Sequence, residues 1–335
     1  MATLSKDCFD RKTQDATCDA AGYSPPMINQ QMIGREWGIL LILAVIWGGA
    51  FMFIGVAVRH VEPLTYVWLR LTIAAGAMFL FLKLRGEQLN LPREVWGSIL
   101  LLALLNNALP FTLFGWGQTH IASGLASILN ATTPIWGVLV AHFFTQDERM
   151  TPRKIAGVLL GFAGVATMIG PMLLAKVGTD ALAQLACIVA ALSYAFAAVW
   201  ARRFRRMGVA PMSVTTGQLT AGALMMLPLA LLVDQPWTQP LPPLTAWGAI
   251  VALALLCTAF GYVLYFRLIE TAGATNALLV TLLVPPFAIF FGSLFLGEVL
   301  APHDFIGLAL IALGLAAIDG RLLKLVGLRS ARQAA

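Results

Sequence analysis

The sequence predicts an all-α polytopic membrane protein with ten transmembrane helices, arranged as two inverted five-helix repeats around a central cavity. Three observations predict this fold. The chain of 335 residues is 59% hydrophobic and only 11% charged, so a soluble core could not cover its apolar surface. Ten apolar stretches are each long enough to span a hydrocarbon layer about 30 Å thick. One spacing of glutamate, proline and glycine occurs at the end of each half.

The repeated spacing joins a glutamate, a proline and three glycines in each half of the chain. The glutamate stands at a span end before a proline-containing turn, so we interpret it as a turn and cap residue. The glycines predict close helix packing. An odd number of crossings in each copy makes the second copy enter the membrane from the opposite side, which gives an inverted repeat. The two copies consist of Glu148, Pro152, Gly157, Gly164 and Gly170, and of Glu298, Pro302, Gly307, Gly314 and Gly320.

All ten spans are expected to be helices, because their apolar runs are continuous and do not alternate as membrane strands do. The first repeat comprises residues 36–174, and the second comprises residues 181–323. A polar tail at 1–35 is expected to be disordered and cytoplasmic, and residues 324–335 form a basic cytoplasmic tail. The expected spans are 37–58, 64–84, 95–118, 121–144, 154–174, 181–201, 211–233, 245–269, 274–297 and 303–323.

Lysine and arginine residues predict the orientation of the chain, because cytoplasmic loops retain them. With a cytoplasmic N-terminus, all 22 fall on the cytoplasmic side except Arg59, Lys176 and Arg70. Both termini are therefore expected in the cytoplasm, with ten spans in a bacterial inner membrane. The formal net charge of +6 follows from this bias, so it does not indicate a nucleic-acid partner.

Polar side chains and prolines gather near the expected centres of several spans, where a lipid-facing helix avoids them. Such groups need partners on neighbouring helices or in a wet cavity. For the asparagines, hydrogen bonds between helices are an equal alternative to substrate binding, and for the prolines a plain kink is the alternative to a gate. The expected substrate-binding residues are Trp47, Asn106, Asn107, Phe111, Asn130, Thr133, Tyr194, Tyr262 and Thr281, with bend points at Pro134 and Pro285.

Two pairs of positions relate the halves to each other. Trp47 and Tyr194 occupy corresponding places in the first spans of the two halves, too deep for an interfacial belt, which favours a shared lining. Arg70 is the one charge expected inside a span, either as a group facing an anion or as a structural donor to helix carbonyls. Its counterpart in the seventh span is Gln218, so the two halves are not expected to contribute equally to binding.

Catalytic and cofactor motifs are missing from the sequence. It contains no phosphate-binding loop, no metalloprotease motif and no pair of intramembrane aspartates. No Asp or Glu is expected near a span centre, which argues against ordinary proton coupling. We therefore expect no enzyme activity and no cofactor. A mostly apolar, aromatic pocket with a few amides and hydroxyls suits a small amphipathic solute.

The stretch Ile46-Trp-Gly-Gly-Ala-Phe51, followed by Pro63-x6-Arg70-x3-Ala-Ala75, resembles the opening of the EamA-type drug/metabolite transporters. Gly297-Glu298 with Gly307 through Gly314 is similar to the ends of that family's halves. The resemblance covers about residues 36–322. It implies a five-plus-five inverted repeat, with spans one to four and six to nine around a central cavity. Within the family, the aromatic and weakly charged midplane most resembles amino-acid exporters, including the aromatic amino-acid exporter.

These observations favour a secondary transporter that exports small amphipathic metabolites by alternating access without ATP. Neutral or aromatic amino acids are the expected substrates. The alternatives are another metabolite or drug, such as a nucleoside or an organic cation, an open channel, and a membrane protein without transport activity. The expected partners are a small-molecule substrate and the lipid bilayer, and the chain is expected to be a monomer.

Overall fold

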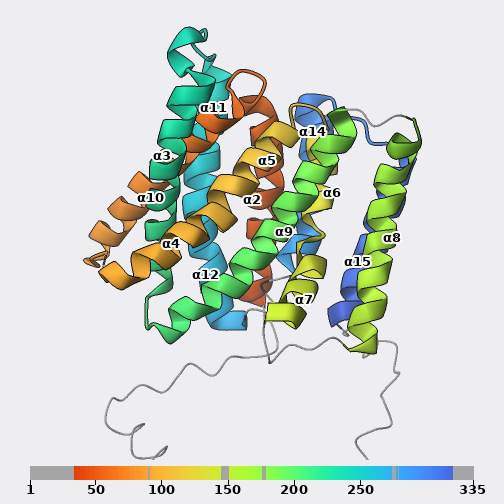
Figure 1. Ribbon diagram of the computed structural model, residues 1–335, viewed down its shortest axis with the longest axis horizontal. Coiled ribbons are helices and arrows are strands. Elements are labelled where there is room, and N and C mark those ends of the chain that lie inside the picture. The colour runs from red at the N-terminus through yellow and green to blue at the C-terminus, as the bar shows by residue number, and fades with distance from the viewer. Residues whose placement is uncertain are drawn as a thin grey trace, which may run out of the picture.

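The computed structural model describes residues 34–319 except 90, 145–150, 176–178, 274–276 and 278. Regular structure in these residues is entirely helical, and most of the helices stand side by side as one bundle (Figure 1). The tails expected at 1–35 and 324–335 lie outside the described residues, apart from Gly34 and Arg35 at the start of the first described helix.

The helices of the first half follow the expected spans closely. Proline stands at the start of α3 and α8, where its missing N–H has no helical partner to lose. The third span contains a π-helical segment between two α-helices, and the fourth span is interrupted near its middle. The elements are α2 (Gly34–Ala57), α3 (Pro63–Leu84), η2 (Arg93–Val95), α4 (Trp96–Ala103), η3 (Leu104–Ala108), α5 (Leu109–Gly117), α6 (Ser123–Asn130), α7 (Thr133–Phe144) and α8 (Pro152–Ala175).

The second half repeats this order. Its third long segment again contains a π-helical stretch, and Gly297 ends the ninth span with φ +67°, a left-handed conformation that favours glycine. The elements are α9 (Thr179–Arg206), α10 (Pro211–Leu229), η4 (Ala230–Asp234), η5 (Pro236–Thr238), α11 (Leu244–Ala252), η6 (Leu253–Phe260), α12 (Gly261–Ala272), α14 (Val280–Leu296) and α15 (Pro302–Asp319).

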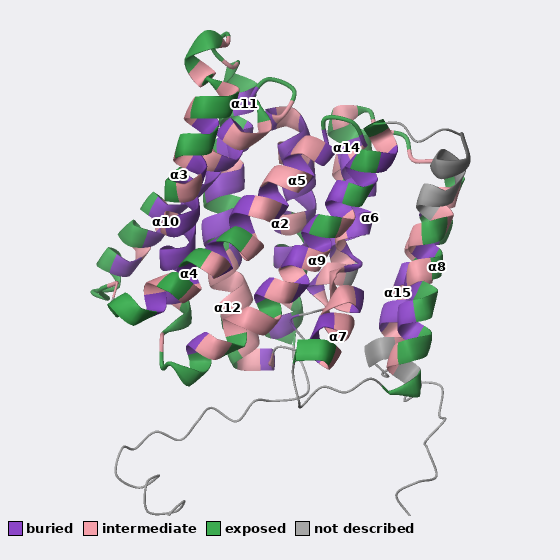
Figure 2. Cartoon of the chain, in the orientation of Figure 1, coloured by how far each residue is buried: buried purple, intermediate pink, exposed green. Residues whose placement is uncertain are grey.

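Most of the described helices are long and apolar enough to cross a membrane. Seven helical segments are long and apolar enough to cross a membrane, and three shorter apolar helices lie at Lys154–Thr167, Leu283–Leu296 and Pro302–Ala317. Buried residues gather between the helices, whereas outward faces are exposed (Figure 2). Leu80, Leu232 and Leu294, all more than half exposed, belong to this apolar outer surface. The fold is therefore a polytopic helical membrane protein, while the count of ten spans stays a prediction.

Helices from the two halves pack against each other in matching pairs. In the described bundle, α2 packs on α14 and α9 packs on α7, while α3 packs on α10. The fifth and tenth spans, α8 and α15, lie side by side at one edge of the bundle (Figure 1). A Cβ on Gly164 would lie 2.7 Å from the Gly307 carbonyl oxygen, and one on Gly314 would lie 2.5 Å from that of Gly157. The close packing expected of Gly157, Gly164, Gly307 and Gly314 is confirmed.

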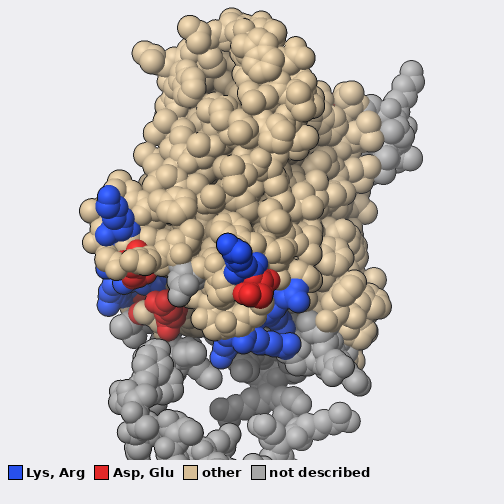
Figure 3. All heavy atoms as spheres, turned by 60° about the vertical axis from the view of Figure 1, so that its left-hand side comes forward, with Lys and Arg blue, Asp and Glu red and all other residues tan. Residues whose placement is uncertain are grey.

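Charged side chains gather at one end of the molecule (Figure 3). This end holds the C-terminus of α3, the start of the third span and the C-terminus of α9. Exposed cations in these places are Lys83, Arg85, Arg93, Arg205 and Arg206. The rest of the face in Figure 3 is free of charged side chains. The charged end is the one that the sequence predicts to face the cytoplasm.

Candidate substrate-binding site

Side chains of one half bind the π-helical segments of the other half. A π-helical segment shifts the backbone hydrogen bonds from four to five residues, which changes the partners of its carbonyl groups. The Ser193 Oγ on α9 donates to the Leu105 carbonyl oxygen in η3 at 2.7 Å. The Trp47 Nε1 on α2 donates to the Cys257 carbonyl oxygen in η6 at 3.1 Å. The first helix of each half is thus bonded to the third span of the other.

A group of amides joins the third, seventh and eighth spans. The Asn106 Nδ2 in η3 donates to the Gln218 Oε1 on α10 at 3.1 Å and to the Tyr262 hydroxyl on α12 at 3.0 Å. The Tyr262 hydroxyl donates in turn to the Asn107 Oδ1 at 3.4 Å. Asn107 is fully buried, and its Nδ2 has no partner among the described residues. We call Asn106, Asn107, Gln218 and Tyr262 the amide cluster.

A buried arginine forms a second polar group beside the first. Arg70 on α3 is 6% exposed, and its Nε donates to the Thr258 Oγ1 in η6 at 2.9 Å. Its guanidinium carbon lies 3.7 Å from the centroid of the Phe111 ring, a cation–π distance. The Tyr66 hydroxyl, one helical turn before Arg70, donates to the Phe111 carbonyl oxygen at 2.7 Å. We call Arg70, Tyr66, Phe111 and Thr258 the arginine cluster.

The two clusters contain the same bridge between helices, built with different chemistry. In one bridge, Arg70 links the second span to the π-helical segment of the eighth. In the other, Gln218 is bonded to Asn106 and links the seventh span to the π-helical segment of the third. Arg70 and Gln218 are the counterparts that the sequence repeat predicts. The structure therefore places a cation in one bridge and a neutral amide in the other.

The two aromatic residues at corresponding positions both lie between the main apolar clusters of the protein. Trp47 and Tyr194 each pack against the same two clusters of buried side chains. The Trp47 ring is 5.3 Å from that of Tyr265, and the Tyr194 ring is stacked on Phe114 at 6.2 Å. A Cβ at Gly261 would lie 2.7 Å from the Trp47 Nε1, so glycine makes room for the indole.

The fourth and ninth spans carry the remaining expected residues. The helix of the fourth span stops at Asn130 and resumes at Thr133. Pro134 has no N–H for the Asn130 carbonyl, and the Thr133 hydroxyl donates to that carbonyl instead, at 2.7 Å. Thr281 is half-buried in the first turn of α14, and Pro285 is buried one turn later within that continuous helix. The roles of these residues in binding and bending stay predictions.

Carboxylates of the second half cap helices of the first half, at the end opposite the charged one. Glu298 accepts hydrogen bonds from the Ser123 amide at 2.8 Å, the Ser123 hydroxyl at 2.7 Å and the Gly124 amide at 3.2 Å. Asp234 accepts from the Thr65 amide at 2.7 Å and its hydroxyl at 2.9 Å. Both carboxylates accept hydrogen bonds from free N–H groups at helix N-termini, where a negative charge is stabilised by the helix dipole. The interpretation of Glu298 as a cap is confirmed, and Glu148 lies outside the described residues.

Five residues that the sequence predicts near span centres belong to the two polar clusters: Asn106, Asn107, Phe111, Tyr262 and Arg70. Trp47, also predicted, lies outside both clusters. Tyr66, Gln218 and Thr258 also belong to the clusters, although the sequence does not predict them as site residues. Gln218 could have been found as the counterpart of Arg70, and Tyr66 by its place one turn before Arg70 on the same helix face. Thr258 gave no signal beyond one hydroxyl in an apolar span.

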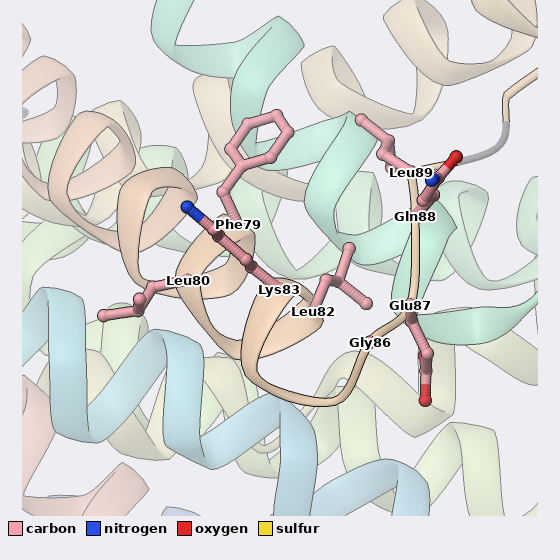
Figure 4. A pocket seen from close by; sticks show the side chains of 8 residues that line it. All are labelled: Phe79, Leu80, Leu82, Lys83, Gly86, Glu87, Gln88 and Leu89. Atoms are coloured by element: carbon pink, nitrogen blue, oxygen red, sulfur yellow. The ribbon is translucent and has the colours of Figure 1, made fainter.

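A cavity of about 540 Å³ lies at the charged end of α3 (Figure 4). None of its lining residues belongs to either polar cluster. It opens among Phe79, Leu80 and Lys83 of the helix and the loop from Gly86 to Leu89. Lys83 and most of this loop are exposed. This cavity lies at the end of a span, whereas the sequence predicts the substrate-binding cavity near the span centres. The central cavity stays a prediction, since the described clusters satisfy most of their polar groups within themselves.

Hydrogen-bonding groups buried among apolar helices from both halves of the chain are typical of a polytopic membrane protein. The chain belongs to the EamA-like transporter family, whose model matches residues 36–170 and again residues 181–318. The prediction of a transporter of this family is thereby confirmed, and the protein is not an enzyme.

Relatives match most of this chain along most of their own length. The uncharacterized transporter YoaV of Bacillus subtilis is 27% identical over 82% of this chain and 94% of its own. A probable terminal-alkyne amino-acid exporter of Streptantibioticus cattleyicolor is 30% identical over 86% of this chain and 94% of its own. The uncharacterized inner membrane transporter YedA of Escherichia coli is 24% identical over 82% and 87%. One crystal structure superposes with a TM-score of 0.61 at 20% identity, covering 85% of this chain and 96% of that one, which shows the shared fold.

Proposed function

We propose that this chain is a secondary transporter of a bacterial inner membrane that exports small amphipathic metabolites, with neutral or aromatic amino acids as its substrates. The observation that carries the proposal is the hydrogen bonding of Asn106 to both Gln218 and Tyr262. These three side chains come from both halves of the chain and lie in long apolar spans. The polar groups of a solute can replace such bonds one for one, which lowers the cost of desolvating the solute in the membrane.

Amino acids are supported by the chemistry around the clusters. The Phe111 ring lies against Arg70, and Trp47, Tyr194 and Tyr262 pack against the apolar cluster that contains Phe111. A solute with an apolar side chain and a compact polar head matches this mixture. The relative from Streptantibioticus cattleyicolor, a probable terminal-alkyne amino-acid exporter, supports the same substrate class.

The proposal includes ten spans, inverted repeats at 36–174 and 181–323, cytoplasmic termini and a monomeric chain. The seven long and three shorter apolar helices support the span count. The π-helical segments in the third span of each half, and the reciprocal bonds of Ser193 and Trp47, support the repeat. The gathering of exposed lysine and arginine at one end supports the orientation.

Export would proceed by alternating access of the two halves around the polar clusters. Glu298 and Asp234 fasten the second half to the first at the end opposite the charged one. Opening that end requires these bonds to break, and the interruption before Pro134 offers a bend point in the fourth span. A solute that takes over hydrogen bonds of the amide cluster would favour the rearrangement by binding the two states differently. No step of this cycle calls for ATP.

Counterflow into proteoliposomes tests the proposal. Purified protein is reconstituted, the vesicles are loaded with one unlabelled solute, and entry of labelled phenylalanine or leucine is measured. We expect saturable counterflow, strongly reduced in Asn106→Ala. Flux of a labelled nucleoside or organic cation, with none for any amino acid, would show another substrate. Non-saturating flux far above carrier rates would indicate a channel.

A further inference from the structure

Arg70 is a permanently charged group held among neutral partners. Only 6% of the residue is exposed. Its Nε donates to the Thr258 hydroxyl, and its guanidinium carbon lies 3.7 Å from the centroid of the Phe111 ring. No described aspartate or glutamate forms an ion pair with it. A buried guanidinium without an anion is costly in a membrane protein, so its retention indicates a function for the charge.

The partners of Arg70 are themselves fixed, which keeps the guanidinium in place. The Thr258 hydroxyl donates its own proton to the Leu253 carbonyl oxygen at 2.7 Å, so its oxygen is free to accept from Arg70. The Phe111 residue is held by the Tyr66 hydroxyl, which donates to its carbonyl oxygen at 2.7 Å. Such an arrangement holds a cation ready for an anion with little further ordering.

The other half of the chain shows that the bridge between helices does not need the charge. Gln218, at the position corresponding to Arg70, links its helix to the opposite π-helical segment through Asn106 at 3.1 Å. A neutral amide is therefore sufficient for this contact in the same fold. If Arg70 were only a structural donor, a glutamine would serve as well and would avoid the cost of burying a charge.

We propose that Arg70 is the binding site for the carboxylate of the transported solute, and that the amide cluster receives its ammonium or other hydrogen-donating group. This inference rests on the transport function proposed above and names the chemistry that its substrate carries. Thr258 of the arginine cluster and Tyr262 of the amide cluster lie four residues apart in one continuous helical segment, so the two clusters adjoin. The side-chain oxygens of Asn107 and Gln218 are acceptors suited to an ammonium group. Organic cations without a carboxylate are excluded as preferred solutes.

Three related probes separate the carboxylate from the rest of the solute. L-phenylalanine carries both charged groups, L-phenylalaninamide lacks the carboxylate, and 3-phenylpropionate lacks the ammonium. Counterflow in proteoliposomes and thermal stabilisation in detergent are measured for each probe with wild type, Arg70→Gln and Arg70→Lys. The glutamine variant copies the bridge of the other half, so it is expected to fold, and size-exclusion chromatography with circular dichroism checks this. Thermal stabilisation is also measured with chloride replaced by methanesulfonate, which carries no carboxylate, to test whether a free inorganic anion binds.

For wild type, we expect phenylalanine to be transported and to stabilise the protein, with phenylalaninamide at least about 10-fold weaker. In Arg70→Gln, the KM for phenylalanine should rise by about 10- to 100-fold and the preference over the amide should disappear. Arg70→Lys should keep part of that preference. Stabilisation of wild type by 3-phenylpropionate, lost in Arg70→Gln, supports the same assignment.

Some outcomes would overturn this assignment while leaving the transport function intact. One is equal transport of phenylalanine and its amide by wild type, a comparison that needs no folded variant. Another is an unchanged KM and preference in a folded Arg70→Gln. Stabilisation by chloride with none by either carboxylate would assign Arg70 to a free anion instead. If wild type transports no amino acid, the proposed substrate is wrong, and the carboxylate site is then tested with 3-phenylpropionate alone. If 3-phenylpropionate does not stabilise wild type more than Arg70→Gln, the carboxylate site is wrong as well.

Discussion

The indole nitrogen of Trp47 donates a hydrogen bond to the carbonyl oxygen of Cys257 at 3.1 Å, across the two halves of the chain. The Cys257 thiol lies 3.3 Å from the Ile46 carbonyl oxygen and donates in the opposite direction. The first span and the π-helical segment of the eighth are thus fastened by two reciprocal contacts. Ser193 makes the corresponding bond to the Leu105 carbonyl in the other π-helical segment. Transmembrane helices gain specificity from such contacts, because lipid offers the backbone no alternative partner.

Removing the indole N–H should destabilise the protein. In Trp47→Phe the Cys257 carbonyl loses its side-chain donor, and we expect the free energy of unfolding to fall by about 0.5–2 kcal/mol beyond the loss from the smaller ring. Trp136→Phe is the matched control, because the Trp136 Nε1 is buried without a partner among the described residues. Denaturation in mixed detergent micelles measures both. Equal losses in the two variants would show that the Trp47 bond contributes nothing.

The Tyr262 hydroxyl should matter for transport more than for folding. It accepts a hydrogen bond from Asn106 and donates one to Asn107, so Tyr262→Phe loosens both amides. We expect the KM for counterflow of the true substrate to rise by about 3- to 30-fold with a small change in melting temperature. Tyr265→Phe is the control one turn away, since its hydroxyl has no hydrogen bond to the described residues. A KM that changes equally in both variants would contradict a binding role for the amide cluster.

Neutralising Glu298 should favour opening of the end opposite the charged one. The carboxylate accepts three hydrogen bonds from Ser123 and Gly124, and the amide of Glu298→Gln would direct a donor against these donors. With hydrogen bonds to charged groups contributing about 1.5–3 kcal/mol, the open population should rise roughly 10-fold or more. The readout is labelling of a cysteine at buried Gln118 by an impermeant maleimide, in a background without other reactive cysteines.

Exposed Glu62 provides the control for that experiment. It lies at the same end of the molecule, just before α3, with an exposed side chain whose carboxylate accepts no hydrogen bond from the described residues. Glu62→Gln should leave the labelling rate at Gln118 near that of wild type. If Gln118 were labelled more slowly in Glu298→Gln than in wild type, the Glu298 carboxylate would not be what keeps this end closed.

Adding a methyl group between α8 and α15 should separate these helices. A Cβ at Gly314 would lie 2.5 Å from the Gly157 carbonyl oxygen and 2.9 Å from the Gly161 nitrogen, and backbone atoms have little room to yield. Gly314→Ala is expected to cost about 1–3 kcal/mol of stability. Gly76→Ala, in the middle of α3 with no atom within 4 Å, should instead stabilise by roughly 0.5–1 kcal/mol. Opposite shifts of melting temperature check both statements.

Much of the fold was predictable because membrane helices follow from local composition. Continuous apolar stretches set the expected positions of most described helices, and the repeated Gly157, Gly164, Gly307 and Gly314 identified the pair that packs most closely. The exception is the ninth span, where part of the expected segment at 274–297 lies outside the described residues and α14 begins at Val280. The break before Pro134 likewise follows from one residue that lacks an N–H.

The candidate site was predictable only as a set of residue types. The sequence marked Arg70, Asn106, Asn107 and Tyr262 because polar groups are costly in hydrocarbon wherever they stand. The sequence by itself also determined the membrane fold, and it showed that a cation, Arg70, in one half corresponds to a neutral amide, Gln218, in the other. Only the tertiary structure decided that Arg70 meets Thr258, that Gln218 meets Asn106 and that the Thr133 hydroxyl is bonded within its own helix. Hydropathy acts residue by residue along the chain, whereas a hydrogen-bond partner depends on helix rotation and on π-helical shifts that are settled when distant segments pack together.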